Sequence, residues 1–489
     1  MFLSLSRSGA GLGRRIRGWS RRLGAALLLA GLCAAPALSQ NLPKELADAW
    51  RATRLPQGAL SLMVKEIGGP VLFSVNPDTP RNPASVMKMV TTWTALSGLG
   101  PDYTWRTAFY AKDGGRIDAQ GTLQGPLYLK AAGDPLLTME ELWGLLRELR
   151  LRGVKNLSEV IVDRSVFGPV AIDPGVFDGA PDRPYNASPD AMMVGLGALR
   201  VLFQPDRAAQ KWVPVLDPPV KSYRVNGEVK WSGGTCTGSP SVSAQVAAVG
   251  AEIVINVSGT APASCGEFSV YRLAISQPEY FAALFQMLWK ELGGTLARGV
   301  KDGRMPAGLR QVVWHESETL ADTIRLINKQ SNNVMARTLL LTLAAQTHGE
   351  GATPQTGAAA ALAVLKSQGV DTRGWVIDNG AGLSREGRLT AQGLVGMLEA
   401  AWRSPMMPEF MSSLAISGVD GTVRRRLRDD QTKGMAHLKT GSLRDVRALA
   451  GYVLGASGKR YIIVSIVNDE RTGAARPFGD ALISWLAAR

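Results

Sequence analysis

Both ends of the chain carry antiparallel β-patterns, and this feature constrains the fold most. Near the N-terminus, alternating apolar stretches at residues 59–65 and 71–75 flank EIGGP and predict a hairpin. Near the C-terminus, MAHLKTGS, RALAGYVLG and RYIIVSIVND predict a three-stranded meander, and a helix at about residues 475–488 follows it. The simplest assembly pairs the hairpin with the meander in one antiparallel sheet that helices cover, an α/β (α+β) fold.

The middle of the chain has a different pattern of secondary structure from its two ends. A chain of 489 residues is longer than one hydrophobic core usually covers, so we expect two or more domains. Helical periodicity begins at Ser85 and returns at residues 278–294 and 320–346, whereas short strands rich in Gly, Pro and Ser predominate between them. We therefore expect a discontinuous domain formed by residues 40–106 and 276–489, with a β-rich insertion, residues 107–275, of one or two subdomains.

Residues 1–39 have the composition of a secretory signal peptide. They contain six arginines and no acidic residue, with an apolar run at residues 23–35 before the small residues of APALSQ. Cleavage after Ala37 or Ser39 fits this pattern. A membrane anchor is the alternative, but a spanning helix needs ~20 apolar residues and this run is shorter. We therefore expect an exported protein.

The net charge is positive with or without this segment. Removing its six arginines lowers the formal net charge from +14 to +8. A basic exported protein suits polyanionic surroundings such as a cell wall or an anionic membrane surface. The sequence has no basic stripe interleaved with aromatic residues, so we do not expect nucleic-acid binding.

The cysteines and histidines are few. Only Cys236 and Cys265 remain after cleavage, and two cysteines in an exported chain indicate one disulfide, with two unpaired buried thiols as the alternative. The three histidines are scattered, without the spacing of metal ligands. We expect neither a metal nor another cofactor.

The stretch NPASVMKMVTT places Ser85 and Lys88 one helical turn apart, on the same face. A serine hydroxyl is a weak nucleophile that needs a base, and a neutral lysine can be that base. Lowering a lysine pKa from ~10.4 to about 7 takes roughly 4–5 kcal/mol, to which a helix N-terminus and a second cation both contribute. Alone, this spacing favours a solvated lysine at a helix start over a catalytic pair.

Two further motifs follow in a fixed order. Ser331-Asn332-Asn333 interrupts a helical pattern with a polar cluster. Lys439-Thr440-Gly441 lies on a predicted strand, where glycine allows a ligand to approach the backbone closely. The order Ser-x-x-Lys, Ser-x-Asn, Lys-Thr-Gly, each on the kind of element that the chemistry needs, is far more specific than any one motif.

This ordered triplet resembles that of the penicillin-binding proteins and serine β-lactamases. The 242 residues between Lys88 and Ser331 leave room for a domain-sized insertion, as in the class C low-molecular-mass penicillin-binding proteins, which are D-alanyl-D-alanine carboxypeptidases and endopeptidases. Further segments carry this resemblance over the mature chain: GDP (133–135), VDRSVF (162–167), YNASP (185–189), NGAGLSR (379–385), GVDGT (418–422) and KTGSL (439–443). The resemblance implies a transpeptidase-like domain with a five-stranded antiparallel sheet between helices.

The resemblance also implies roles for the first two motifs. Ser85 would attack the carbonyl between two D-alanines, or of a D-alanyl cross-link, and form an acyl-enzyme. Lys88 would take the hydroxyl proton, Ser331 would relay a proton to the leaving amine, and Asn333 would hold the substrate amide.

The third motif would bind the substrate's other end. Lys439 and Thr440 would bind the terminal carboxylate, and Lys439 would also depress the pKa of Lys88. Gly441 would let the substrate approach the strand, and the backbone N–H groups of Ser85 and Ser442 would form the oxyanion hole.

Three residues outside these motifs are weaker candidates for substrate contacts. Asp163 would meet the free amine of a peptide side chain, with a strand-end cap as the alternative. Arg385 would border the same pocket or pair structurally. Arg444 replaces the smaller or uncharged residue expected after KTGSL and would alter the preference for the leaving group.

The sequence therefore predicts a periplasmic D,D-peptidase with peptidoglycan peptides as substrates and β-lactams as inhibitors. It leaves open a homo-oligomer and peripheral association with the membrane or wall. The alternatives are a serine β-lactamase and a non-catalytic protein that binds cell-wall peptides. A glutamate-bearing loop, as in class A β-lactamases, is not found in residues 334–438, and the polar side chains of the three motifs disfavour a non-catalytic protein.

Overall fold

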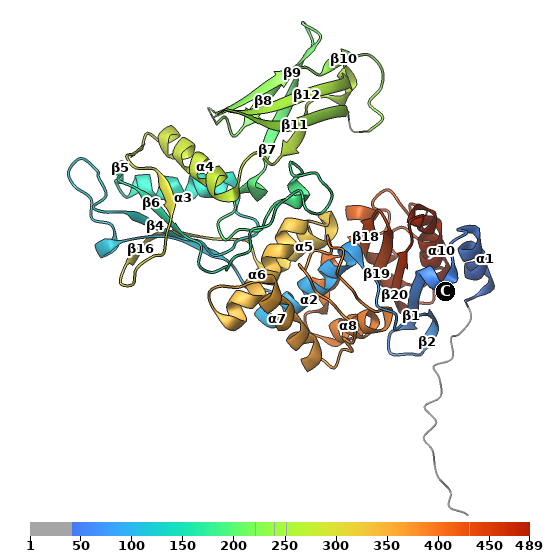
Figure 1. Ribbon diagram of the computed structural model, residues 1–489. Coiled ribbons are helices and arrows are strands. Elements are labelled where there is room, and N and C mark those ends of the chain that lie inside the picture. Colours follow the sequence, from blue (N-terminus) through green and yellow to red (C-terminus); the bar gives the residue numbers. More distant parts are fainter. Residues whose placement is uncertain (1–41, 221, 239, 251, 430) are drawn as a thin grey trace, which may run out of the picture. The chain divides into compact units, whose positions relative to one another are not determined.

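A computed structural model describes residues 42–489 except residues 221, 239, 251 and 430 (Figure 1). The expected signal peptide, residues 1–39, lies outside the described residues. Among the residues that are described, no helix has both the length and the apolar character needed to cross a membrane.

Within the described chain, six strands form an antiparallel sheet in the order β17-β18-β19-β20-β1-β2. Its strands are β1 (Leu60–Glu66), β2 (Val71–Val75), β17 (Ala415–Ile416), β18 (Ala436–Leu443), β19 (Val446–Leu454) and β20 (Arg460–Asn468). The N-terminal hairpin joins the C-terminal meander through β1 and β20, with Leu60 opposite Val467. The expected antiparallel sheet is therefore present, and the short edge strand β17 adds one strand to the five expected.

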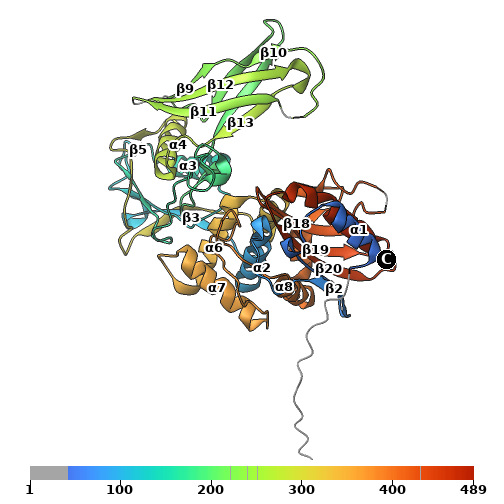
Figure 2. The same ribbon diagram turned by 45° about the vertical axis from the view of Figure 1, so that its right-hand side comes forward.

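Helices cover both faces of this sheet, because alternate strand residues point to opposite sides. On β20, Ile463 packs with α1 (Lys44–Ala52) and α10 (Arg476–Ala487). Its neighbour Val464 belongs to the core that α2 (Met87–Leu99) and α8 (Ala391–Arg403) cover. Figures 1 and 2 show α1 and α10 on one side of the sheet and α2 and α8 on the other.

Helix α2 lies within the core. A 3-10 turn, η2 (Ala84–Val86), leads into it, and every residue from Met87 to Leu96 is buried, so burial reaches all sides of the helix instead of one face. The helical pattern expected over residues 320–346 is two helices, α5 (Leu320–Gln330) and α6 (Asn333–His348). The remaining helices of this core are α7 (Pro354–Ser367) and α9 (Met407–Ser413).

A second, mixed sheet has the order β15-β6-β4-β3-β16. It comprises β3 (Arg106–Ala111), β4 (Leu127–Lys130), β6 (Val160–Asp163), β15 (Val300–Asp302) and β16 (Arg310–Glu316), with β5 (Asn156–Leu157) paired to β14 (Thr295–Leu296) nearby. Helices α3 (Met139–Leu151) and α4 (Gln277–Glu291) share its hydrophobic core. This sheet therefore takes strands from both sides of the limit expected at residue 275.

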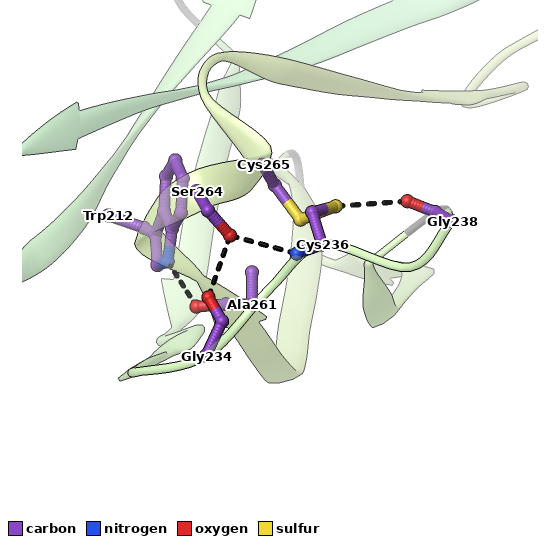
Figure 3. The surroundings of a disulfide bond; sticks show 7 residues. All are labelled: Trp212, Gly234, Cys236, Gly238, Ala261, Ser264 and Cys265. Atoms are coloured by element: carbon purple, nitrogen blue, oxygen red, sulfur yellow. Dashed lines mark hydrogen bonds between the residues drawn. A yellow bond between two sulfur atoms is a disulfide. The ribbon is translucent and has the colours of Figure 1, made fainter.

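The rest of the insertion consists of two β-sheets around one small core. One sheet contains β7 (Leu199–Asp206), β8 (Lys211–Asp217) and β13 (Phe268–Arg272), and the other contains β9 (Tyr223–Gly227), β10 (Lys230–Ser232), β11 (Ser241–Val249) and β12 (Glu252–Pro262). Cys236 and Cys265 form a disulfide here (Figure 3). The hydroxyl of Ser264 bridges the same loop, because it accepts from the Cys236 N–H and donates to the Gly234 carbonyl.

Short 3-10 turns complete the described chain: η1 (Gln57–Ala59), η3 (Lys112–Gly114), η4 (Pro184–Asn186), η5 (Gly195–Gly197), η6 (Ala263–Cys265), η7 (Gly421–Val423) and η8 (Thr472–Ala475).

Candidate active site

Ser85 lies in η2, immediately before α2. The turn that presents it is anchored to the end of β20, because the Asn82 N–H donates to the Asn468 side chain and the Asn468 amide donates back to the Asn82 carbonyl. Ala84, the residue before Ser85, is fully buried and has a φ of 44°, which is a strained conformation for a residue with a Cβ. Such strain persists where the surrounding structure holds a functional side chain in place.

Lys88 is one turn further along and is fully buried. Its Nζ lies 3.0 Å from Ser85 Oγ and 2.6 Å from each of two acceptors, Asn333 Oδ1 and the Ala381 carbonyl. Both of these oxygens accept a hydrogen bond from the amine and cannot donate one. When Lys88 is neutral, its two N–H bonds can point to them, so its lone pair faces the hydroxyl of Ser85.

The surroundings of Lys88 favour this neutral form. Burial lowers the pKa of Lys88 well below its usual range, and the nearby positive charges of Lys439 and Arg337 lower it further. Two nearby cations thus add to the effect of desolvation in lowering the pKa of Lys88.

The break between α5 and α6 places the second motif. Ser331 has a left-handed backbone conformation, φ 58° and ψ 40°, and ends α5, while Asn332 caps α6 by accepting from the Met335 N–H. This reversal directs Asn333 to Lys88 and to the Tyr185 carbonyl, which accepts from Asn333 Nδ2 at 3.2 Å. The hydroxyl of Ser331 accepts from Lys439 Nζ at 2.8 Å.

Strand β18 carries the third motif past the serine. Lys439 is fully buried, donates to Ser331 Oγ and to the Thr440 carbonyl, and burial lowers its pKa to about 7. A Cβ on Gly441 would lie 2.6 Å from the Pro83 carbonyl oxygen and 3.1 Å from the Ser85 nitrogen, so glycine is required for this approach. Thr440 hydrogen-bonds to Thr422 at 2.8 Å.

A cavity of about 520 Å³ opens at this point. Its lining includes Ser85, Ser331, Thr440, Gly441 and Ser442, one or more from each of the three motifs. The structure thus brings the expected core residues together around one hollow. In the part of the chain that the structure describes, β17 pairs with His437 and Leu438 alone, so no strand covers that edge of β18 from Lys439 onward. An extended chain can approach there.

The three peripheral candidates lie elsewhere or face other partners. Asp163 ends β6, where its carboxylate accepts from the Ser165 and Met305 N–H groups and pairs with Lys130 at 3.1 Å. Burial raises the pKa of Asp163, but the hydrogen bonds from Ser165, Met305 and Lys130 outweigh it and hold the value at about 2. In the described chain, none of these contacts reaches Ser85 or Lys439. They fit the strand-end role that was its alternative, and a contact with a substrate amine stays a prediction.

Arg385 and Arg444 are both exposed. Arg385 pairs with Asp445 at 3.2 Å, and its guanidinium lies 4.5 Å from the ring centroid of Phe177, which belongs to the insertion. None of these contacts involves a residue of the three motifs, and Arg385 does not line the cavity at Ser85. Arg444 is in the turn between β18 and β19, where its carbonyl accepts from the Thr472 hydroxyl.

Sequence reasoning missed two groups that contact or influence Lys88. The Ala381 carbonyl reaches Lys88 because Gly382, at φ 73°, packs so tightly that a Cβ would lie 1.8 Å from the Ala84 oxygen. A backbone acceptor leaves no trace in a sequence. Arg337, 6% exposed and one turn after Asn333, does leave one, since it is a lone charge in the apolar stretch VMARTLLLTLAA.

Among the described residues, no cluster of three or more His, Cys, Asp or Glu side chains could hold a metal ion. The residues that do converge are two serine hydroxyls, Ser85 and Ser331, each hydrogen-bonded to a buried lysine amine. Together with the antiparallel sheet between helices, they define a serine hydrolase of the penicillin-binding type.

Comparison with known proteins gives the family. The model of the D-Ala-D-Ala carboxypeptidase 3 (S13) family matches residues 40–489, and the chain belongs to this family. The resemblance inferred from the three motifs is thereby confirmed, as is the expectation of a hydrolase of the D-Ala-D-Ala carboxypeptidase type.

Individual relatives align with most of the chain. A D-alanyl-D-alanine carboxypeptidase of Actinomadura sp. (strain R39) is 30% identical over 446 residues, which cover 86% of this chain and 79% of the relative. The D-alanyl-D-alanine carboxypeptidase DacB of Haemophilus influenzae is 25% identical over 86% of this chain and 88% of its own. The crystal structure of penicillin binding protein 4 from H. influenzae superposes with a TM-score of 0.73 at 23% identity, covering 91% of this chain and 99% of that one. This last likeness confirms the fold.

Proposed function

We propose that Ser85 is the nucleophile of a D-Ala-D-Ala carboxypeptidase and D,D-endopeptidase that acts on peptidoglycan stem peptides and cross-links. The observation that supports this proposal most is the 3.0 Å contact between Ser85 Oγ and Lys88 Nζ, with Lys88 buried and its pKa lowered. Membership of the D-Ala-D-Ala carboxypeptidase 3 (S13) family supplies the reaction class.

In the first half-reaction, Ser85 Oγ attacks the carbonyl carbon of the penultimate D-alanine while its proton passes to Lys88 Nζ. The backbone N–H groups of Ser85 and Ser442 stabilise the oxyanion, a contribution typically of ~3–4 kcal/mol. Ser331 Oγ then donates its proton to the leaving amine as the C–N bond breaks, and Lys439, 2.8 Å from Ser331 Oγ, is placed to replace that proton. The products are an ester at Ser85 and the free amine of the leaving residue.

Before the second half-reaction, Lys88 gives up the proton that it took from Ser85, and this proton replaces the one that Ser331 and Lys439 passed to the leaving amine. Water then attacks the ester carbonyl and gives a proton to the neutral Lys88. Ser85 leaves as the alkoxide and recovers a proton from Lys88, so the enzyme returns to its starting state. Asn333 has its Oδ1 engaged by Lys88, and its Nδ2 is available to hold the amide of the acyl part in place of the Tyr185 carbonyl.

The terminal carboxylate of the substrate would lie beside Lys439, Thr440 and Ser442. A pKa of about 7 means that Lys439 loses its proton readily in the free protein, and a bound carboxylate raises that pKa again. Substrate binding therefore restores the second cation next to Lys88, which keeps Lys88 neutral when it is needed as a base.

The same proposal extends to location, domains and partners. We expect export by a signal peptide at residues 1–39 and action in the periplasm on wall peptides, with β-lactams as inhibitors; association with the wall or membrane and a homo-oligomer stay open. The strand pairing of β3 with β16 and of β6 with β15 favours an inserted region that extends to about residue 316, beyond the limit of 275 expected from the sequence. The catalytic domain would then be residues 40–105 and 317–489.

The test is release of D-alanine from a peptide ending in L-Lys-D-Ala-D-Ala, measured alongside cleavage of a D-alanyl cross-linked muropeptide. The wild-type protein should release D-alanine, and Ser85→Ala should not. Ser367→Ala, at an exposed serine near the end of α7, is the matched control and should match the wild type. Equal release by Ser85→Ala and wild type would refute the proposed nucleophile.

A further inference from the structure

The cavity at the catalytic serine extends well beyond the three motifs. From Thr440 and Ser442 it continues between the sheet and the C-terminal helix, where Arg447 and Leu449 of β19 and Ser465 of β20 line it. Its volume of about 520 Å³ lies within the range of ~300–1,000 Å³ typical of sites for drug-sized ligands. A single leaving D-alanine, one of the smallest amino acids, would fill only a part of it.

The lining of this extension is strongly basic. Arg426, Arg447 and Arg476 contribute to it, and no acidic residue does so in the described chain. Arg426 is already paired with Asp480, whose carboxylate accepts from its Nε and Nη2. By contrast, no described acidic side chain forms an ion pair with Arg447 or Arg476, although Arg447 Nη1 donates to the Leu443 and Val446 carbonyls.

Two more features favour the binding of an anion in this extension. Arg476 begins α10, so the positive end of that helix dipole adds to its charge. Ser465 is 4% exposed and lines the cavity, so its hydroxyl adds a polar group to the lining.

We propose that this extension is a second anion subsite, which binds a carboxylate carried by the leaving group in addition to the one beside the scissile bond. The proposal rests on the proposed function, because it takes the leaving residue to lie at Lys439 and Thr440. The side chains of Arg447 and Arg476 are the specificity-determining groups. The preferred leaving groups would be amino acids or peptides with two carboxylates, such as the branch released when a cross-link is cut.

The position of the subsite follows from the strand. Lys439 and Gly441 face Ser85 and α2, whereas Thr440 and Ser442 alternate to the opposite side of β18, where the arginines lie. The acyl part is directed the other way, toward Asn333. A fragment that leaves from beside Thr440 therefore has the arginine-lined space ahead of it.

The chemistry of the step is unchanged by this subsite. The C–N bond of the substrate breaks, Ser85 keeps the acyl group, and the leaving amine takes one proton from Ser331. The second carboxylate takes no part in bond making, and its ion pair with Arg447 and Arg476 raises kcat/KM by holding the leaving group in place.

The test compares three peptides that share the acyl part acetyl-L-Lys-D-Ala and differ in the final residue: D-alanine, D-norleucine or D-2-aminoadipate. D-norleucine matches the length of D-2-aminoadipate without its second carboxylate. For the wild-type protein, kcat/KM should be about tenfold or more higher for D-2-aminoadipate than for D-norleucine, as expected for a charge-assisted hydrogen bond. This ratio should fall as NaCl is raised, because salt screens the ion pair.

Arg476→Gln and Arg447→Gln should each lower that ratio about tenfold. Arg425→Gln is the matched control, since Arg425 is exposed on the neighbouring segment and does not line the cavity, and its ratio should equal that of the wild type. A wild-type ratio near one, or a ratio unchanged in both cavity variants, would overturn the subsite. Failure of all three peptides, including D-alanine, would instead overturn the proposed function and this proposal with it.

Discussion

The side-chain oxygen of Asn333 accepts a hydrogen bond of 2.6 Å from Lys88 Nζ across a sequence separation of 245 residues. This contact joins the first motif to the second, and the insertion lies between them in the chain. Lys439, a further 106 residues along the sequence, closes the set through Ser331. The site therefore exists only when two distant parts of the chain have folded together.

Gly441→Ala tests the close approach of β18 to the serine. The added Cβ would lie 2.6 Å from the Pro83 oxygen and 3.1 Å from the Ser85 nitrogen, so strand and turn must separate. We expect acylation by penicillin to slow at least tenfold, because the oxyanion donors move out of place. Gly396→Ala is the control: this glycine is in α8 with nothing within 4 Å, so alanine should leave acylation unchanged and stabilise the helix by about 1 kcal/mol. Equal acylation rates in both variants would contradict the packing argument.

Arg337→Gln tests the contribution of a positioning residue that acts through Lys88. Its positive charge lowers the pKa of Lys88, so removing it should raise that pKa and move the acidic limb of the kcat/KM profile to higher pH. Acylation should be slowed severalfold at pH 6 and recover as the pH rises.

Arg337→Lys keeps the charge and should retain more of the wild-type profile. A loss of rate by the same factor at every pH would show that Arg337 acts only as a structural donor to the Ala187 carbonyl.

Lys439→Met tests the burial of the second lysine through the pH dependence of stability. The native pKa of about 7 lies below the unfolded value, so between pH 7 and about 10 the unfolded chain binds more protons than the native one at this site. The free energy of unfolding then rises with pH, by up to about 1.4 kcal/mol per pH unit from this site. The variant lacks this site, so its unfolding free energy should rise less steeply than that of the wild type over the same interval. Parallel curves would mean that the pKa of Lys439 is not lowered in the native protein.

The disulfide should stabilise the insertion and leave the chemistry untouched. Cys236 and Cys265 are 29 residues apart, and closing a loop of this size is worth roughly 3–4 kcal/mol in the chain-entropy description. Replacing both cysteines by serine should lower the stability of the small β-core around β7–β13, seen as faster proteolysis within residues 199–272. Penicillin acylation of the same sample should be unchanged, and a parallel loss of acylation would show that the insertion supports the site.

The sequence was most informative where a pattern is local. Alternation along β1, β2 and β18–β20 predicted the sheet, since a two-residue period fixes which side chains are buried. The spacing of Ser85 and Lys88 predicted their contact, because an interval of three residues covers one helical turn. The two cysteines predicted their own pairing because no other cysteine follows the expected signal peptide.

Features that depend on distant partners were not accessible in this way. The expected end of the insertion at residue 275 rested on the change from short strands to helical periodicity. However, β15 and β16 pair with β6 and β3, which lie more than a hundred residues earlier in the chain. Asp163 was a substrate candidate from its motif alone, and its ion pair with Lys130 emerges only in three dimensions. The Ala381 carbonyl and the three arginines of the cavity come from four separate segments of the chain. The sequence alone therefore did not place them at the site.

The central claim is that Lys88 activates Ser85, and intact-mass spectrometry after incubation with penicillin tests it most directly. The wild-type protein should gain the mass of one penicillin, and peptide mapping should place it on Ser85. Lys88→Ala, which keeps Ser85 in its turn but removes the base, should gain no adduct in the same time. An adduct elsewhere in the wild type, or normal acylation of Lys88→Ala, would contradict the account.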